Sequence, residues 1–271
     1  MALRSATINV MVKAAQKAAR GLIRDFGEVE QLQVSQKGPA DFVSTADLQA
    51  ERTLRQELKK ARPEFGLLME EGTVETGTDP RHRWIVDPLD GTLNFLHGLP
   101  HFAISIGLER DGEIVAGVVY DPIKDEMFWA ERGAGTYVND RRLRVSARRE
   151  LGQAVIATGM PNRGRPEHTA YLAMLSAVMA ETAGIRRFGA AALDLAYVAA
   201  GRYDGYFETG LSPWDIAAGI LLVREAGGYV SEIAGGHHML QSGSILAGND
   251  HLHLPLGSVL RGAGQVKRAA V

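Results

Sequence analysis

Near the start of the chain, apolar residues recur at intervals of three and four positions. They are Ile8, Met11, Val12, Ala15, Ala19, Leu22, Ile23 and Phe26. This spacing predicts an amphipathic helix whose apolar stripe packs against a core. The first 24 residues hold five basic residues and no acidic one, which is also the composition of a cleavable organellar presequence. Because the stripe is regular, we interpret the segment as a packed helix.

The following stretch combines one more helix with two strands that end on acidic residues. A helical pattern covers residues 47–61. An apolar strand at residues 65–69 then runs into Glu70-Glu71. After a polar loop, a buried strand at residues 84–86 ends at Asp87. Both strands therefore deliver carboxylates at their carboxyl ends.

The pattern changes twice along the rest of the chain. Short alternating strands with turns between them predict an antiparallel meander at residues 102–108, 114–120, 127–130 and 136–138. Later strands are expected at residues 154–158, 185–188, 203–208, 229–231 and 245–247, and helices between them at 171–179, 190–200 and 216–226. We therefore predict an α+β half over residues 1–148 and an α/β half over residues 149–271.

Composition excludes several classes of protein. The chain has 30 basic and 32 acidic residues, and this net charge of −2 gives no support for direct nucleic-acid binding. It has no cysteine, which excludes disulfides, thiolate metal sites and cysteine nucleophiles and is consistent with a cytoplasmic location. The longest apolar run, residues 216–223, is far shorter than the roughly 20 residues of a membrane span. We expect no membrane segment.

The most informative stretch reads Trp-Ile-Val-Asp-Pro-Leu-Asp-Gly-Thr-Leu-Asn-Phe at residues 84–95. Asp87 ends the strand and Asp90 follows three residues later across a tight turn, so both carboxylates can face one hard cation. Gly91 and Thr92 then open a helix, where exposed amides bind an anion well. The alternative is a plain turn with a capping aspartate.

Two further acidic positions have an ordinary structural explanation, without a functional role, when each is taken alone. Asp215 precedes the apolar run at residues 216–223 and is a typical helix N-cap. Glu70-Glu71 is an ordinary polar strand end. Their combination with residues 84–95 changes this interpretation.

Together these stretches resemble the inositol monophosphatase family of Mg²⁺-dependent, lithium-sensitive phosphatases. The resemblance includes Lys-Gly at residues 37–38, Asp-Phe-Val-Ser-Thr-Ala-Asp at 41–47 and Pro-Trp-Asp-Ile-Ala-Ala-Gly at 213–219. The segment Gly-Ala-Ala-Ala-Leu-Asp-Leu-Ala-Tyr-Val-Ala-Ala-Gly-Arg-Tyr-Asp-Gly at 189–205 is most similar to the bacterial SuhB-like branch. The resemblance implies a layered α-β-α-β-α sandwich with the active site between its halves.

The resemblance also implies the site residues. One Mg²⁺ is expected on Glu70, Asp87 and the Leu89 carbonyl; a second on Asp87, Asp90 and Asp215; a third on Glu70 with waters. Asp47, Thr92 and Glu70 are expected to be catalytic, and Asp47 and Thr92 are expected to position the attacking water. The Gly91 and Thr92 amides are expected to hold phosphate. Residues expected to face the substrate's hydroxyl-bearing part are Asp90, Gly189, Ala191, Glu208 and Asp215.

Simple physics agrees with these implied ligands. Four carboxylates within about 4–6 Å repel by some kcal/mol per pair at an effective dielectric constant near 20, so cations must stabilise them. Oxygen ligands without His or Cys favour Mg²⁺, with Mn²⁺ as a substitute, over zinc. Two such ions can activate water and hold the leaving oxygen. Asp87, shared by both ions, is the central ligand.

Some other positions carry weaker signals. His97 and His101 flank the aspartate motif, and we interpret them as local hydrogen-bonding residues, with a substrate role as the alternative. His237-His238 is interpreted as a solvated loop rather than a metal pair, and Lys37 as a residue that either steers phosphate or metal access or has no role in the site. Leu93 and Ala190 stand where the family commonly has Thr and a hydroxyl residue, which affects substrate detail only.

We expect a phosphomonoesterase that acts on myo-inositol 1-phosphate and related polyol or sugar monophosphates. Glu208 favours a neutral polyol, although it can also be a strand-end acid that faces water. Histidinol phosphate, fructose bisphosphate and phosphoadenosine phosphate are the alternative substrates. The SuhB-like resemblance implies a second possibility, association with RNA polymerase and Nus factors in antitermination. The family commonly forms homodimers, and we expect the apolar meander at residues 102–138 to offer the surface.

Overall fold

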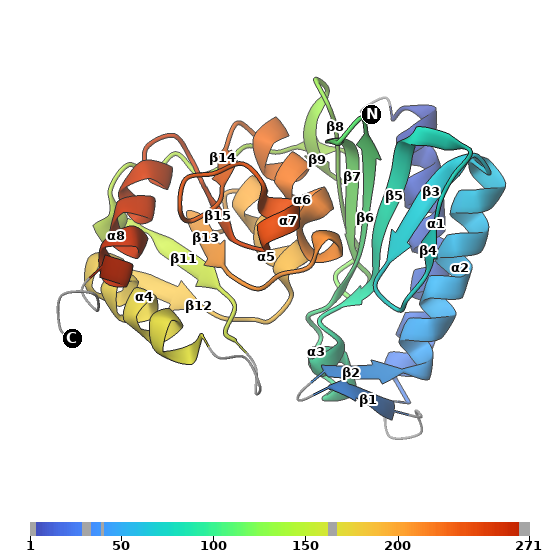
Figure 1. The fold of residues 1–271 in the computed structure, drawn as a ribbon, viewed down its shortest axis with the longest axis horizontal. Helices are drawn as coiled ribbons and strands as arrows, with labels where there is room; N and C mark the ends of the chain where they lie inside the picture. Colours follow the sequence, from blue (N-terminus) through green and yellow to red (C-terminus); the bar gives the residue numbers. More distant parts are fainter. Residues whose placement is uncertain (1–3, 29–33, 39–40, 162–166, 266–271) are drawn as a thin grey trace.

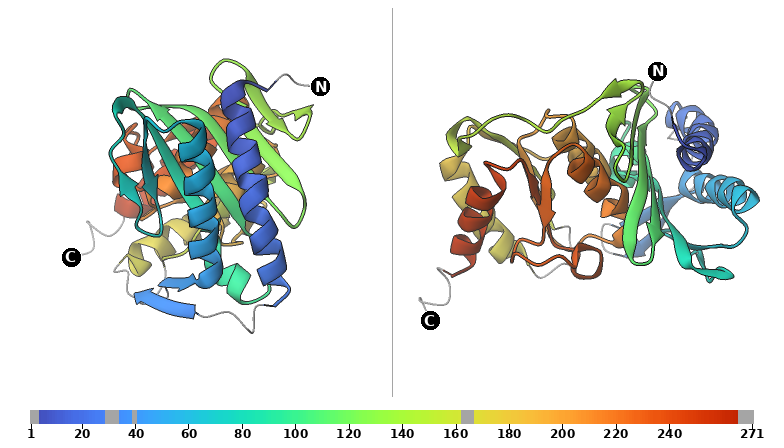
Figure 2. Two further views of the ribbon diagram at one scale, coloured as in Figure 1. Left: turned by 90° about the vertical axis from the view of Figure 1, so that its right-hand side faces the viewer. Right: turned by 90° about the horizontal axis from the view of Figure 1, so that it is seen from above.

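The computed structural model describes residues 4–28, 34–38, 41–161 and 167–265. Layers of helix and sheet alternate across the molecule (Figure 1 and Figure 2). Helices α1 (Ala6–Phe26) and α2 (Thr45–Ala61) cover an eight-stranded sheet, and α5 (Ala191–Ala199) and α6 (Pro213–Glu225) separate it from a five-stranded sheet. Helices α4 (His168–Glu181) and α8 (His253–Gln265) form the last layer. The layered α-β-α-β-α sandwich is therefore confirmed.

The eight-stranded sheet has the order β10-β9-β8-β7-β6-β5-β3-β4. Its strands are β3 (Phe65–Met69), β4 (Val74–Glu75), β5 (Asp79–Asp90), β6 (Ala103–Arg110), β7 (Glu113–Asp121), β8 (Glu126–Glu131), β9 (Gly135–Val138) and β10 (Arg141–Arg142). Strands β3 and β5 are parallel, while β5 to β10 pair antiparallel in sequence order, which confirms the meander. The polar loop predicted before the strand at residues 84–86 was partly wrong, because residues 73–82 contain β4 and the start of β5.

The two outer helices begin where serine caps them. The Ser5 hydroxyl accepts a hydrogen bond from the Ile8 amide at 3.2 Å and caps α1, which confirms the packed helix. Helix α2 starts two residues before the predicted position, because Ser44 is its N-cap. Both helices bury apolar stripes against the sheet. A short hairpin of β1 (Val34–Gly38) and β2 (Asp41–Ser44) leads into α2.

The five-stranded sheet has the order β12-β11-β13-β15-β14. Its strands are β11 (Val155–Thr158), β12 (Gly184–Arg186), β13 (Gly205–Glu208), β14 (Tyr229–Ser231) and β15 (Ile245–Gly248). Strand β11 runs parallel to both β12 and β13, so the carboxyl ends of β11 and β13 are neighbours. The sequence did not predict α7 (Met239–Ser242) or α8. At α8, Leu252, Leu256 and Leu260 pack in one core cluster with the five-stranded sheet.

Helix α6 lies between the two sheets, which explains its apolar run: residues 216–223 are buried throughout. Glycines in the sheet let this helix come close. A Cβ at Gly107 would lie 2.9 Å from Ala217 Cβ, and one at Gly117 would lie 2.9 Å from the Ala218 oxygen. This close packing brings the first turn of α6, with Asp215, towards the end of β5.

The strands of the eight-stranded sheet all precede the predicted division at residue 148, and those of the five-stranded sheet all follow it. One core cluster nevertheless joins both halves, because it contains Ile85 and Phe128 together with Leu195 and Ile220. The division itself stays a prediction. Among the residues described, no helix has the length and apolar content to cross a membrane.

Candidate active site

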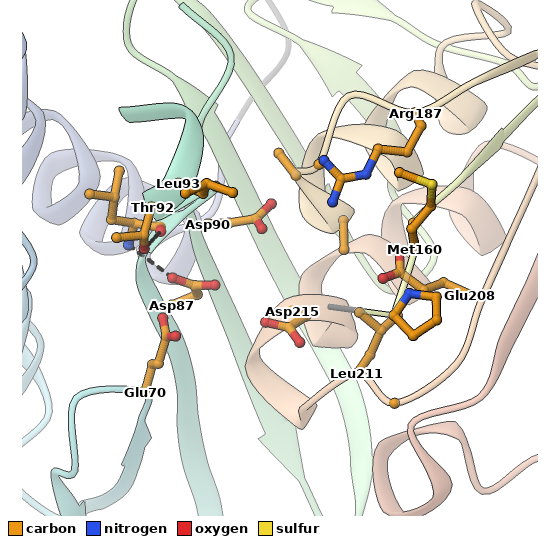
Figure 3. A pocket seen from close by; sticks show the side chains of 18 of the residues that line it. Glu70, Asp87, Asp90, Thr92, Leu93, Met160, Arg187, Glu208, Leu211 and Asp215 are labelled. Atoms are coloured by element: carbon orange, nitrogen blue, oxygen red, sulfur yellow. Dashed lines mark hydrogen bonds between the residues drawn. The ribbon is translucent and has the colours of Figure 1, made fainter. Parts of the chain in front are cut away.

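A cleft of about 240 Å³ lies where the two halves meet. From the first half it is lined by Glu70, Asp87, Leu89, Asp90, Gly91, Thr92 and Leu93; from the second by residues 159–161, Arg187, residues 189–191, residues 208–211 and Asp215. In Figure 3, Glu70, Asp87 and Asp90 stand on one side, and Asp215 and Glu208 on the other. Every residue expected in the site lines this cleft except Asp47. Their chemical roles stay predictions.

The turn after β5 has the expected strand–turn–helix form. Asp87 and Asp90 are both buried, and the Leu89 amide donates a hydrogen bond to Asp87 Oδ1 at 2.9 Å. Gly91 has a φ of +92°, a conformation that side chains disfavour, and a Cβ there would lie 3.1 Å from the His101 oxygen. It is the N-cap of α3 (Thr92–Leu96). Glycine is therefore required for the turn that places both aspartates.

The acidic groups of the cleft disfavour each other's ionised forms. Burial raises the pKa of Asp87 well above its ordinary value, and the charges of Glu70, Asp90 and Asp215 raise it further. The pKa of Asp90 is raised mainly by burial and then by the charge of Asp215. A bound cation removes this penalty because it stabilises the ionised carboxylates.

The donor set fits a hard cation, since it consists of oxygen atoms alone. In the described part of the chain, no group of three or more His, Cys, Asp or Glu side chains is placed so that it could hold a metal ion.

A hydroxyl and a buried carboxylate lie directly behind the Asp87–Asp90 turn. Thr92 Oγ1 is 3.0 Å from both Asp47 Oδ1 and the Leu89 oxygen, so it can donate to either. Asp47 Oδ2 in turn accepts hydrogen bonds from the Ser44 amide, at 2.9 Å, and from the Ser44 hydroxyl. Burial raises the pKa of Asp47. Ser44, which sequence reasoning missed, thus orients the Asp47–Thr92 pair.

Asp90 and Asp215 both lie at helix N-termini. Asp90 Oδ2 accepts the Ala192 amide of α5 at 2.8 Å, and Asp215 Oδ2 accepts the Ser212 amide at 2.7 Å. Ser212 is the N-cap of α6, and Asp215 is the acid three residues later. The interpretation of Asp215 as the N-cap was therefore wrong, since Ser212 has that position, and Asp215 completes the capping box from inside the helix while it lines the cleft. The positive ends of the two helices help to stabilise these carboxylates.

The turn that follows Glu70 is held by a residue that the sequence pattern did not single out. Glu51 of α2 accepts hydrogen bonds from the Glu71 amide at 2.8 Å and the Thr73 hydroxyl at 2.6 Å. These bonds hold the turn that follows β3. Glu71 itself does not line the cleft, so the acidic pair separates into a cleft residue and a turn residue.

The wall from the second half contains one residue that sequence reasoning missed. Arg187 is the sole basic residue among the described residues that line the cleft. It adds a positive charge near Gly189, which has a φ of +79°. Behind this wall, Asp194 has both carboxylate oxygens buried without a partner among the described residues. Burial, and then the charge of Glu208, raises its pKa well above the ordinary value and favours its neutral form.

The histidines take no part in the cleft. His101 Nε2 is buried without a hydrogen-bond partner in the described structure, and its ring packs against Phe188 with centroids 5.1 Å apart. Burial lowers its pKa to about 4. The imidazole ring therefore packs, and the local hydrogen bonds of His101 are made by its backbone, whose oxygen accepts from Asn94 Nδ2 at 2.8 Å. His97, His237 and His238 are exposed, and the side chain of Lys37 lies outside the described residues.

Comparisons with known proteins agree on one family. The sequence pattern of the Inositol monophosphatase family matches residues 3–261. The chain is 60% identical over 258 residues to the inositol-1-monophosphatase of Rhizobium meliloti (strain 1021), covering 95% of this chain and 97% of that protein. It is 46% identical over 242 residues to the Nus factor SuhB of Escherichia coli (strain K12), covering 89% and 91%. The crystal structure of extragenic suppressor protein SuhB from Bartonella henselae superposes with a TM-score of 0.92 at 61% identity, covering 94% and 98%.

Proposed function

The chain belongs to the inositol monophosphatase family of metal-dependent phosphatases, and from this premise we propose that it hydrolyses myo-inositol 1-phosphate and related polyol or sugar monophosphates. The observation that carries the proposal is the cleft in which Glu70, Asp87, Asp90, Glu208 and Asp215 meet from both halves of the chain. Such a site suits a substrate that offers a phosphate to cations and hydroxyls to a carboxylate.

We propose Mg²⁺ as the metal, with two or three ions per site and Mn²⁺ as a substitute. Glu70, Asp87 and the Leu89 carbonyl would hold one ion; Asp87, Asp90 and Asp215 would hold the second; Glu70 with waters would hold the third. When bound, these ions supply Lewis-acid activation of water and stabilise the leaving oxygen. The buried acids of this cleft, whose pKa values are raised by burial and mutual repulsion, support that assignment.

The remaining groups orient the reactants. Because the Asp47 carboxylate is fixed by Ser44, it holds the Thr92 hydroxyl at the edge of the cleft, where this pair would position the attacking water. The Gly91 and Thr92 amides, at the start of α3, would bind phosphate oxygens. Glu208 would accept hydrogen bonds from vicinal hydroxyls, beside the backbone at Gly189 and Ala191.

A phosphate-release panel tests the substrate assignment. With Mg²⁺, we expect the highest kcat/KM for inositol 1-phosphate and lower values for histidinol phosphate, fructose bisphosphate and phosphoadenosine phosphate. Glu208 disfavours a second phosphate, although Arg187 offers one cation on the same wall. Faster release from either bisphosphate would show that Arg187 governs selection and would contradict the proposal.

Replacing Glu208→Gln should lower kcat/KM for inositol 1-phosphate by about 10- to 100-fold, since hydrogen bonds to a desolvated charged group contribute about 1.5–3 kcal/mol each. Hydrolysis of a small aryl phosphate, which lacks the hydroxyls, should change much less. Both substrates are measured on the same preparation, with Glu71→Gln, outside the cleft, as the control. Equal losses on both substrates would mean that Glu208 supports the metal site instead.

A second function is favoured by the 46% identity to the Nus factor SuhB. Association with RNA polymerase and Nus factors would let the protein act as a binding module in addition to its catalysis. A pull-down with purified polymerase and Nus factors tests this. A cytoplasmic location, expected from the cysteine-free sequence, is part of the same proposal.

We also propose a homodimer, for which light scattering at micromolar concentration should give about twice the chain mass of 29.3 kDa. The reason expected from the sequence was wrong: of the large apolar side chains between residues 102 and 138, Ile123 alone is exposed, because helices cover both faces of the meander. A mass near 29 kDa would contradict the dimer.

A further inference from the structure

Two residues enclose the Glu208 carboxylate, one buried behind the cleft wall and the other lining the cleft. The first is Tyr206, which precedes Glu208 by two positions on β13 and therefore projects from the same face of the strand. Tyr206 is fully buried in the core shared by both halves, whereas the intervening Phe207 packs with α4 and α8 on the opposite face. The strand thus places a buried phenol directly behind the acid at its end.

The phenol is bonded to that acid. Tyr206 Oη donates a hydrogen bond of 2.5 Å to Glu208 Oε2. Burial raises the pKa of Tyr206 well above its ordinary value, so the hydroxyl remains a donor. A buried hydroxyl without a partner costs about 1–3 kcal/mol. The core therefore favours the one Glu208 position that keeps this bond.

The second residue is Gly159, immediately after β11. Because β11 pairs in parallel with β13, Gly159 lies next to the carboxyl end of β13. A Cβ on Gly159 would come within 2.0 Å of Cδ, Oε1 and Oε2 of Glu208, which real atoms cannot do. The carboxylate therefore occupies space that exists only because residue 159 has no side chain.

We propose that Tyr206 and Gly159 are positioning residues that hold the Glu208 carboxylate in its place on the cleft wall. Through Glu208 they determine affinity for the hydroxyl-bearing part of the substrate, and they leave the phosphate chemistry unaffected. The inference rests on the proposed contact between Glu208 and substrate hydroxyls. A fixed acceptor binds more tightly than a mobile one, because less conformational entropy is lost when the substrate binds.

The test compares KM with kcat in Tyr206→Phe, which removes only the hydroxyl. We expect KM for inositol 1-phosphate to rise about 3- to 20-fold, with kcat within about twofold, because the lost interaction acts in substrate binding. Gly159→Ala displaces the same carboxylate from the other side and should give the same split. Tyr203→Phe is the matched control: Tyr203 is another buried tyrosine, just before β13, and should leave KM unchanged. The aryl phosphate should show no change in KM with any of the three variants.

A double-mutant cycle with Glu208→Gln separates this inference from the proposed function. If Tyr206→Phe acts through Glu208, its effect on KM should largely disappear in the Glu208→Gln background. An undiminished effect there, or an unchanged KM in Tyr206→Phe while Glu208→Gln raises it, would overturn the inference and leave the proposed function intact. If Glu208→Gln itself leaves KM for inositol 1-phosphate unchanged, the proposed polyol contact fails first.

Discussion

Replacement of Asp87 by asparagine should lower kcat by about 10³-fold or more and leave the fold intact, since one anionic ligand shared by two ions is lost. Asp87 is buried at the end of β5, and the charges of Glu70, Asp90 and Asp215 all act on it. Asparagine has nearly the same shape and can still accept the Leu89 amide through Oδ1. The change therefore removes charge without opening a cavity.

Steady-state phosphate release at saturating Mg²⁺ measures this effect, and circular dichroism checks the fold. Asp121→Asn is a matched control, because Asp121 is a buried aspartate at the end of β7 that lies outside the cleft. It should keep near-normal kcat, even though the loss of its ion pair with Lys124 can lower the Tm. Near-normal turnover of Asp87→Asn would refute the shared-ligand assignment.

Stability gives an independent measurement of the same residue. In chelator, Asp87→Asn should unfold at the same or a higher temperature than the parent protein. In the parent protein, burial raises the pKa of the Asp87 carboxyl, so its ionised form destabilises the fold at neutral pH. The uncharged amide of the variant removes that penalty. Added Mg²⁺ should raise the Tm of the parent more than that of the variant.

Metal removal should abolish activity altogether. The cleft offers oxygen donors without cysteine or histidine, so EDTA should leave no phosphate release and Mg²⁺ should restore it, with Mn²⁺ able to substitute. Lithium should inhibit at millimolar concentration, as the family resemblance implies. Activity is followed by phosphate release during stepwise addition of each cation to the chelated protein.

Two outcomes have different meanings here. Full activity in the presence of chelator would refute a metal-dependent mechanism. A Mg²⁺-dependent enzyme that lithium does not inhibit would affect only the placement within the lithium-sensitive group. Calcium serves as the control cation, because it also prefers oxygen ligands but takes longer bonds and more flexible geometry than Mg²⁺.

The local part of the site was predictable from the sequence. Asp87, Asp90 and Thr92 fall within six residues, so one strand, one turn and one helix start determine their relative positions. Long apolar patterns likewise predicted α1, the meander and α6. The sequence reasoning missed α8, which includes Pro255 in its first turn and three glycines further along, residue types that disfavour a helix.

The long-range part depended on the tertiary structure. Asp90 meets the Ala192 amide 102 positions later, and Glu51 holds the turn after Glu70 across 20 positions. The family resemblance assigned Asp215 and Glu208 to the site, but spacing alone could not have brought them there. Arg187, Tyr206 and Gly159 had no local signal at all.

The sequence by itself therefore determined the elements and the Asp87–Thr92 turn, because hydrophobic periodicity and turn chemistry act over a few residues. Only the tertiary structure decided which strand ends and helix starts meet at the cleft. That outcome depends on strand order and on the close packing of α6 against Gly107 and Gly117, which bring Asp215 to the end of β5. Contacts between distant segments form only once both sheets are assembled, so no window of the sequence contains them.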